Sequence, residues 1–389
     1  MYAAAPAHLG LALPFFPWPP VPSSPEPPRP SDDVGELTST PPATGGAVTT
    51  SERPRSSEPA SKRHSTIPPS GKGELRESQI TQTVPVIPES PEGTLLWRVR
   101  GMIRSLRPQQ WVKNLFVLAP IVFAKELTRP ALLVSAAGAF AIFCLLAGAV
   151  YTLNDLVDAP ADRVHPVKRF RPIASGRVPV PVAKAMVAGL VVISIGAALA
   201  FFPLAFALVA LAYFAQNVAY SFKLKKIAYV DVGFIAFGFV LRVLAGGFAT
   251  RTYVSFYLIA CTALLALFLG FGKRRHELAG TNAKKQRSAL EAYTPRALTI
   301  ALAVTGLLTL GAYLAYTLDS ATQIYFGTKW LWVTTIHPVF GVIRFLQLVA
   351  GRPKAESPTQ EMLRDVPFVL NLVLFVIEAL FFVYNVKFS

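Results

Sequence analysis

The chain has 389 residues, of which 52% are hydrophobic and 15% charged, and its formal net charge is +16. This apolar content exceeds that of an ordinary soluble domain and predicts a membrane protein. The positive charge does not indicate nucleic-acid binding, because the basic residues lie between apolar runs and form no separate basic domain.

Residues 1–95 are expected to form a disordered cytoplasmic tail. They are rich in Pro, Ser, Thr, Gly and Glu, a composition that cannot bury enough apolar surface to fold. The early apolar patch from Leu9 to Trp18 lacks a preceding basic segment and is interrupted by prolines, so we expect no cleaved signal peptide. We predict that the tail is dispensable and that residues 96–389 form one transmembrane catalytic domain.

Nine apolar segments follow, most of them near the ~20 residues that a helix needs to cross a bilayer. They are approximately Trp111–Ala124, Ala131–Leu153, Val182–Phe202, Leu204–Tyr220, Tyr229–Phe248, Phe256–Phe271, Ala297–Leu318, Trp330–Ala350 and Val366–Val386. Helices close their own hydrogen bonds in lipid. The sequence therefore predicts an all-α polytopic bundle of about nine transmembrane helices.

The basic residues predict which side of the membrane each end of the chain occupies. Clusters precede the first segment and follow the second, fourth, sixth and eighth, whereas the other connections hold few basic residues. The positive-inside rule then places the N-terminus in the cytoplasm and the C-terminus outside. An even number of spans would break this pattern.

Four oxygen-bearing side chains stand where the second segment leaves the bilayer: Asn154, Asp155, Asp158 and Asp162. At ~100° per helical residue they share an arc of about 100°, so they can present oxygens to one point. Such oxygen ligation suits Mg²⁺. We predict a magnesium site here, with Asp155 and Asp158 catalytic. The alternative is a solvated helix end whose acids pair with nearby arginines.

Three cations follow this acidic motif directly, namely Lys168, Arg169 and Arg171. Lys and Arg bind phosphate oxygens and stabilise the charge that develops on a departing diphosphate. We therefore predict a site for a metal and a polyphosphate, with Lys168 as a catalytic cation. The alternative for each residue is a topology signal alone.

A second group of polar residues surrounds the fifth and sixth segments. Tyr220, Lys225 and Asp231 lie at or near the connection between the fourth and fifth segments, Arg242 lies inside the fifth, and Lys273, Arg274 and Glu277 follow the sixth. An ionisable residue inside a transmembrane segment is by default functional or paired. Arg242 is expected to face the bundle interior, towards either Asp231 or an anionic ligand. Before the first segment, Lys113 and Asn114 are further candidates for substrate binding.

The spacing of these motifs resembles the UbiA superfamily of intramembrane prenyltransferases over residues 100 to 389. The resemblance is carried by the acidic motif, by Tyr220-Ser221-x-x-Leu224-Lys225, and by the number of spans. Four further stretches resemble the decaprenyl-phosphate phosphoribosyltransferase branch. They are Arg107-Pro108-Gln109-Gln110-Trp111-Val112-Lys113-Asn114, Lys168-Arg169-Phe170-Arg171-Pro172-Ile173-Ala174, Leu241-Arg242-x-x-Ala245-Gly246-Gly247 and Gly272-Lys273-Arg274-Arg275-x-Glu277-Leu278.

The resemblance implies a UbiA-like bundle in the cytoplasmic membrane with its active site facing the cytoplasm. It implies transfer of 5-phosphoribose from phosphoribosyl diphosphate to a polyprenyl phosphate, as a step towards a lipid-linked arabinose donor. The acidic motif would hold Mg²⁺ against the diphosphate, and Lys113 with Arg242 or Lys273 would hold the lipid phosphate. A homo-oligomer is left open.

Two departures from the family pattern bear on this expectation. The family's second motif carries a pair of acids, but the position four residues after Asp231 is Ile235. This argues against the alternative function, in which a prenyl diphosphate is joined to an aromatic or other small acceptor. Pro160 is expected to kink or end the helix before Asp162. A transporter is disfavoured, because the charges gather at one side of the membrane.

Overall fold

The computed structural model describes residues 93–279, 288–351 and 358–384, so almost all of the predicted tail lies outside the described residues. Within these ranges every regular element is helical, which confirms the all-α prediction. The longer elements are α1 (Leu95–Leu106), α3 (Pro130–Arg163), α4 (Val180–Phe201), α5 (Leu204–Phe222), α6 (Val230–Thr250), α7 (Phe256–Ala279), α9 (Pro295–Leu318), α11 (Ile336–Gly351) and α13 (Val366–Tyr384). The shorter ones are η1 (Pro108–Leu118), α2 (Ala119–Phe123), η2 (Lys168–Phe170), η3 (Leu224–Lys226), η4 (Ser288–Ala292), α10 (Ser320–Phe326), η5 (Trp330–Thr335) and α12 (Pro358–Arg364).

Eight of the predicted spans form helices that are long and apolar enough to cross a membrane, counted over the described ranges. The eighth predicted span begins as η5 and continues as α11. The largest difference in length is in α3, which runs to Arg163 and so carries the whole acidic motif on helix. The expectation that Pro160 ends this helix is wrong. Pro160 lies near the C-terminus of α3, where it removes only one late hydrogen bond.

The first predicted span differs in form, because it consists of the 3₁₀ helix η1 and the short helix α2. Its start lies at one end of the bundle, where Arg107 pairs with Asp155 on α3. Its far end lies at the other, where Lys125 donates to the backbone carbonyls of Tyr325 and Phe326. A 3₁₀ helix rises ~2 Å per residue, so η1 and α2 together cover ~30 Å, the thickness of the hydrocarbon core. Together η1 and α2 are therefore long enough for a ninth crossing, as the sequence predicted, in addition to the eight spanning helices of the described ranges.

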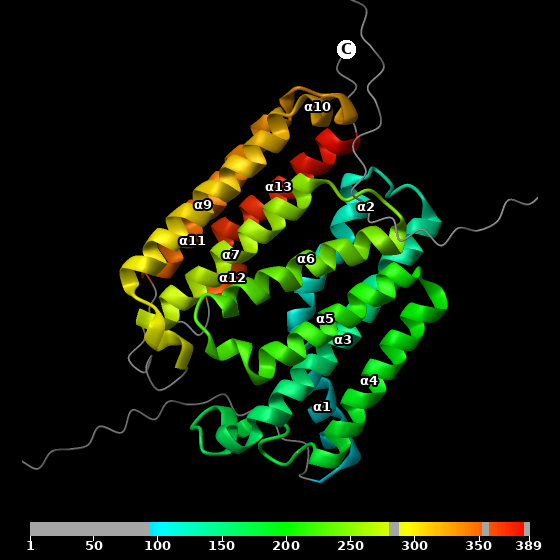
Figure 1. The fold of residues 1–389 in the computed structure, drawn as a ribbon, viewed down its shortest axis with the longest axis vertical. Helices are drawn as coiled ribbons and strands as arrows, with labels where there is room; N and C mark the ends of the chain where they lie inside the picture. Colours follow the sequence, from blue (N-terminus) through cyan, green and yellow to red (C-terminus); the bar gives the residue numbers. More distant parts are fainter. Residues whose placement is uncertain (1–92, 280–287, 352–357, 385–389) are drawn as a thin grey trace, which may run out of the picture. The chain divides into compact units, whose positions relative to one another are not determined.

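Two apolar cores hold the described helices together. The first includes Phe143 of α3, Phe206 of α5 and Leu241 of α6. The second includes Phe268 of α7 and Phe345 of α11. Figure 1 shows α6 lying between the helices of the first core and α7, so the paired α6 and α7 connect the two cores.

Gly246 explains how η1 packs so closely on α6. A Cβ atom at this position would overlap the backbone carbonyl oxygen of Val117 in η1. Small residues allow such close backbone approach between membrane helices. The close contact with η1 therefore requires a glycine at position 246.

We expect Gly246→Ala to destabilise the protein by about 3 kcal/mol, because a backbone atom cannot move aside as a flexible side chain can. Thermal unfolding in detergent measures this loss. Gly189→Ala is the matched control, since a Cβ there meets no other atom within 4 Å. Equal stability of the two variants would contradict the proposed packing.

Helix α13 has few buried residues, and a polar group attaches it to α11. His337 Nε2 lies 2.7 Å from Glu378 Oε2, and His337 Nδ1 lies 2.8 Å from Asn371 Oδ1. The Asn371 amide also donates to the His337 carbonyl, so its oxygen faces the imidazole and Nδ1 must carry a proton. His337 of α11 therefore contacts two polar side chains of α13, Asn371 and Glu378.

We expect Glu378→Ala and His337→Ala each to lower stability, with a coupling of about 1 kcal/mol between them. A double-mutant cycle of thermal unfolding in detergent measures that coupling. Glu378→Gln keeps a hydrogen-bonding side chain and should lose less than Glu378→Ala. Additive losses in the cycle would mean that the two side chains do not hold each other.

Candidate functional site

Each carboxylate of the acidic motif on α3 faces a different cation. Asp155 is buried, and its Oδ1 lies 2.6 Å from Arg107 Nη2. Asp158 is paired with Lys225 at 3.0 Å, and Asp162 with Arg171 at 2.6 Å. Arg171 also lies 3.4 Å from Asp155. The acids therefore gather cations from three separate segments of the chain at the end of α3.

Arg107 is the residue of this group that the sequence did not assign to the site. In the sequence its charge served as a topology signal, and Arg107-Pro108 began one of the stretches that resemble the family, without a role for Arg107 itself. In the structure Arg107 has a left-handed backbone conformation, with φ 51°. This turn between α1 and η1 brings its guanidinium to Asp155 and to within 5.3 Å of the Tyr151 ring.

The donor set on α3 fits a hard divalent cation in its chemistry. It consists of three carboxylates and the half-buried amide of Asn154, and it has no imidazole or thiol. No group of three or more Asp, Glu, His or Cys side chains converges on a metal position among the described residues. The acids are neutralised by Arg and Lys, as the alternative reading of the motif required. If a metal took the place of these cations on the carboxylates, the freed Arg and Lys side chains could bind phosphate.

The cationic loop after α3 separates into two parts. Arg171 points to the acids, but Lys168 and Arg169 are exposed, and the Arg169 guanidinium stacks 4.8 Å from the Phe170 ring centre. His165 is structural, because its Nδ1 accepts hydrogen bonds from the backbone amides of Val167 and Lys168. The geometry therefore places Arg171 within the acidic group and leaves Lys168 and Arg169 on the loop surface.

Arg242 is buried in α6, as expected, and of its two candidate partners Asp231 is not in contact with it. Its Nε donates to Asn114 Oδ1 at 2.8 Å and its Nη2 to Tyr213 Oη at 2.8 Å. Its Nη1 donates to the Gly238 carbonyl. Asp231 lies eleven positions earlier on the same helix, ~16 Å away along the axis. Arg242 is thus held by neutral groups, and within the described ranges it forms no ion pair.

Further cations lie close to Arg242. The positive charges of Lys273, Arg242 and Arg107 all act on the Lys113 ammonium. Asn114 follows Lys113 on η1 and accepts the Arg242 hydrogen bond, while its amide donates to Cys144 Sγ at 3.3 Å. The structure therefore joins predicted site residues from η1, α6 and α7 into one cationic group beside the acidic motif.

Asp231 belongs to a second network, which meets the cationic group at Lys273. It is fully buried, forms an ion pair with Arg274 Nε at 2.7 Å, and accepts a hydrogen bond from Tyr293 Oη at 2.7 Å. Glu277 pairs with the other side of the Arg274 guanidinium and lies 4.0 Å from Lys273. Tyr220 is close enough to interact electrostatically with Arg274.

Tyr293 was not predicted, and no local signal in the sequence marks it. Burial and the hydrogen bond to Asp231 raise the pKa of Tyr293 well above its usual range, so the hydroxyl stays protonated and keeps donating. Its oxygen also accepts from the backbone amide of Tyr229, a non-glycine residue with φ 65°. This contact positions the entry to α6, where Asp231 lies.

Comparisons with known proteins identify the family and the fold. The model of the UbiA prenyltransferase family matches residues 115–373. A decaprenyl-phosphate phosphoribosyltransferase of Corynebacterium glutamicum is 35% identical over 63% of this chain and 75% of its own length. That of Mycolicibacterium smegmatis is 34% identical over 69% of this chain and 87% of its own length. A UbiA homolog from Archaeoglobus fulgidus, solved bound to GPP and Mg²⁺, has a TM-score of 0.57 at 18% identity and covers 73% of this chain and 99% of its own.

Proposed function

The chain belongs to the UbiA prenyltransferase family, and from this premise we propose that it transfers 5-phosphoribose from phosphoribosyl diphosphate to a polyprenyl phosphate. The relatives named above, which act on decaprenyl phosphate by name, support this acceptor. The enzyme is an integral membrane protein. We infer that it lies in the cytoplasmic membrane with the site facing the cytoplasm, because the basic connections gather at that end of the bundle.

The cationic group of Lys113, Arg242 and Lys273 is the observation that carries the proposal. Arg242 is 7% exposed and is bound only by neutral acceptors within the described part of the chain. A positive charge in a membrane interior is costly unless an anion accompanies it. A lipid phosphate supplies that anion, and its apolar tail suits the surrounding helices.

The acidic motif and its cations would bind the phosphoribosyl donor. Asn154, Asp155, Asp158 and Asp162 are the residues that would hold Mg²⁺, which would neutralise charge on the diphosphate of the donor. Arg107 and Arg171 lie against the same carboxylates and would bind the diphosphate oxygens directly. Lys168 and Arg169 would reach the donor from the loop.

The reaction then needs positioning and charge stabilisation more than a base. An oxygen of the lipid phosphate attacks the anomeric carbon of the ribose as the bond from that carbon to the diphosphate oxygen breaks. The diphosphate leaves with the bonding electrons, and Arg107 and Arg171 stabilise its growing charge. A phosphate dianion is already a competent nucleophile, so no side chain has to remove a proton.

Asp231 argues against the alternative of prenyl transfer to a small aromatic acceptor. That chemistry in this family uses a second acidic motif, but here Asp231 is fully buried and bound by Arg274 and Tyr293. Its partner position is Ile235. The second motif therefore has an internal structural partner in place of a second metal.

We expect Arg171→Ala to raise the KM for phosphoribosyl diphosphate at least about tenfold, because a charged hydrogen bond to the donor is lost. The double variant Lys168→Ala with Arg169→Ala should have a smaller effect, since both side chains are exposed. Steady-state kinetics with saturating lipid acceptor separate the two results. An unchanged KM in Arg171→Ala would reduce this residue to a structural partner of Asp162.

A comparison of two donors in separate reactions tests the proposed function. The purified protein is given phosphoribosyl diphosphate with polyprenyl phosphate, and in a second reaction a prenyl diphosphate with an aromatic acceptor, each with Mg²⁺. Consumption of phosphoribosyl diphosphate alone, abolished by EDTA, is the expected result. Consumption of the prenyl diphosphate alone would replace the proposal by the alternative.

A further inference from the structure

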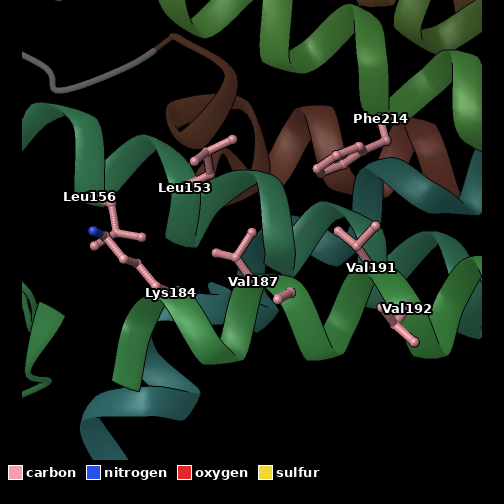
Figure 2. Close-up of a pocket in the computed structure, with 8 residues that line it drawn as sticks. Leu153, Leu156, Lys184, Val187, Val191, Val192 and Phe214 are labelled. Atoms are coloured by element: carbon pink, nitrogen blue, oxygen red, sulfur yellow. The ribbon is translucent and has the colours of Figure 1, made fainter. Parts of the chain in front are cut away.

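An apolar groove lies on the membrane-facing side of α3, α4 and α5, away from the proposed catalytic site. Its volume is about 360 Å³. Figure 2 shows its lining residues, among them Leu153 and Leu156 of α3, Val187 and Val191 of α4, and Phe214 of α5. Only three residues of α4 are buried, so this helix offers most of its surface to the surrounding lipid.

Lys184 is the one charged residue that lines this groove. It lies in the second turn of α4, at the end of the bundle that carries the acidic motif. Figure 2 shows its side chain reaching from α4 to Leu156, at one end of the groove, with the amino group beside Leu156. No hydrogen bond or ion pair to Lys184 is found within the described ranges. Lys184 is exposed near the end of a membrane-spanning helix, where a lysine head group binds an anion or water at the membrane surface.

We propose that this groove binds an anionic phospholipid, with the lipid phosphate on Lys184 and one acyl chain along the stripe formed by Val187, Ala188 and Val191. Positions 184, 187, 188 and 191 lie on one helical face, so the head and the chain follow a single line. The remaining lining is apolar and suits an acyl chain. Charge complementarity favours an anionic over a zwitterionic lipid.

The position of the groove on α3 separates this lipid from the lipid substrate. At ~100° per residue, the arc of Asn154, Asp155, Asp158 and Asp162 is centred opposite the direction of Leu153 and Leu156. A phosphate at Lys184 therefore lies across α3 from the carboxylates and cannot take part in the transfer. The bound lipid is a resident component of the fold.

Leu156 connects this lipid to the site. It lines the groove, and it also packs on the small core of Ala159, Ile173, Val178 and Ala183. This core fixes the loop that carries Arg171. An acyl chain against Leu156 would stabilise that loop, and with it the Arg171 contacts to Asp155 and Asp162.

Native mass spectrometry of the detergent-purified chain, titrated with phosphatidylglycerol or phosphatidylcholine, tests the proposal. We expect phosphatidylglycerol to bind more tightly than phosphatidylcholine. Lys184→Gln should weaken the affinity for phosphatidylglycerol about fivefold. Val191→Trp should fill the groove and remove the bound lipid. Lys226→Gln, an exposed lysine at the same end, and Leu199→Trp, an exposed α4 position outside the groove, are matched controls and should bind normally.

Three results would overturn the proposal. Equal affinity for the two phospholipids would show that the anionic head group is not recognised. Wild-type binding in Lys184→Gln or Val191→Trp would show that the lipid does not bind in this groove. Displacement of phosphatidylglycerol by polyprenyl phosphate would instead make the groove a substrate site. Because the readout is lipid binding, these outcomes are independent of whether phosphoribosyl transfer is observed.

Discussion

Replacement of Asp155 by Asn is expected to lower turnover by a hundred- to a thousandfold, on the order of the loss seen when one preorganised electrostatic group is removed from an active site. Asp155 is buried and joins Arg107 and Arg171 at one carboxylate. Asparagine keeps the volume but removes the charge that orients both arginines and that a metal would need. Asp155→Ala should be at least as impaired.

Steady-state turnover with both substrates saturating measures this effect, and thermal unfolding in detergent shows whether the variant is folded. Glu126→Gln is the control, because it removes a carboxylate from an ion pair with Arg129, 2.8 Å long, in the α2–α3 connection far from the site. It should leave turnover unchanged. Full activity in Asp155→Asn would exclude the acidic motif from the reaction.

Arg242→Gln is expected to lower kcat/KM for the polyprenyl phosphate at least about a hundredfold, because the lipid phosphate loses a desolvated cationic partner. Arg242→Lys should lie between this variant and the wild type. It keeps the charge, but one ammonium cannot reach Asn114, Tyr213 and the Gly238 carbonyl as the guanidinium does. The expected order of activity is therefore Arg, then Lys, then Gln.

Kinetics with each substrate varied in turn distinguish a binding role from a structural one. The KM for the polyprenyl phosphate should rise more than that for phosphoribosyl diphosphate. Tyr213→Phe removes one of the three acceptors and keeps the aromatic ring that stacks on Arg242, so its loss should be smaller. Wild-type kinetics in Arg242→Gln would assign the buried arginine to folding alone.

Much of the fold follows from local patterns in the sequence. Apolar runs separated by basic clusters predict about nine spans and their order, because each helix satisfies its own backbone in lipid, and eight of them form long apolar helices in the described ranges. The spacing from Asn154 to Asp162 places the acidic motif on one helix face, and α3 carries it there. The form of the first segment could not be predicted, because η1 packs closely against Gly246, which lies more than a hundred positions away in the sequence.

The partners of the charged residues were harder to predict than the residues themselves. Arg242 was correctly expected to face the interior, but its contact with Asn114 spans 128 positions. Arg107 was seen only as a topology signal and as part of a motif, since its pairing with Asp155 depends on a left-handed turn and joins residues 48 positions apart. Charge placement is visible in a sequence, whereas the choice among several nearby opposite charges is made by tertiary packing.

The most direct measurement of the central claim follows two labels of the donor at once. Purified protein in detergent is incubated with Mg²⁺, polyprenyl phosphate and phosphoribosyl diphosphate that carries ¹⁴C in the ribose and ³²P in the 5-phosphate. The account predicts that both labels enter the organic phase in their original ratio and that EDTA prevents this. If both labels remain in the aqueous phase while the protein is folded, the proposed transfer is contradicted.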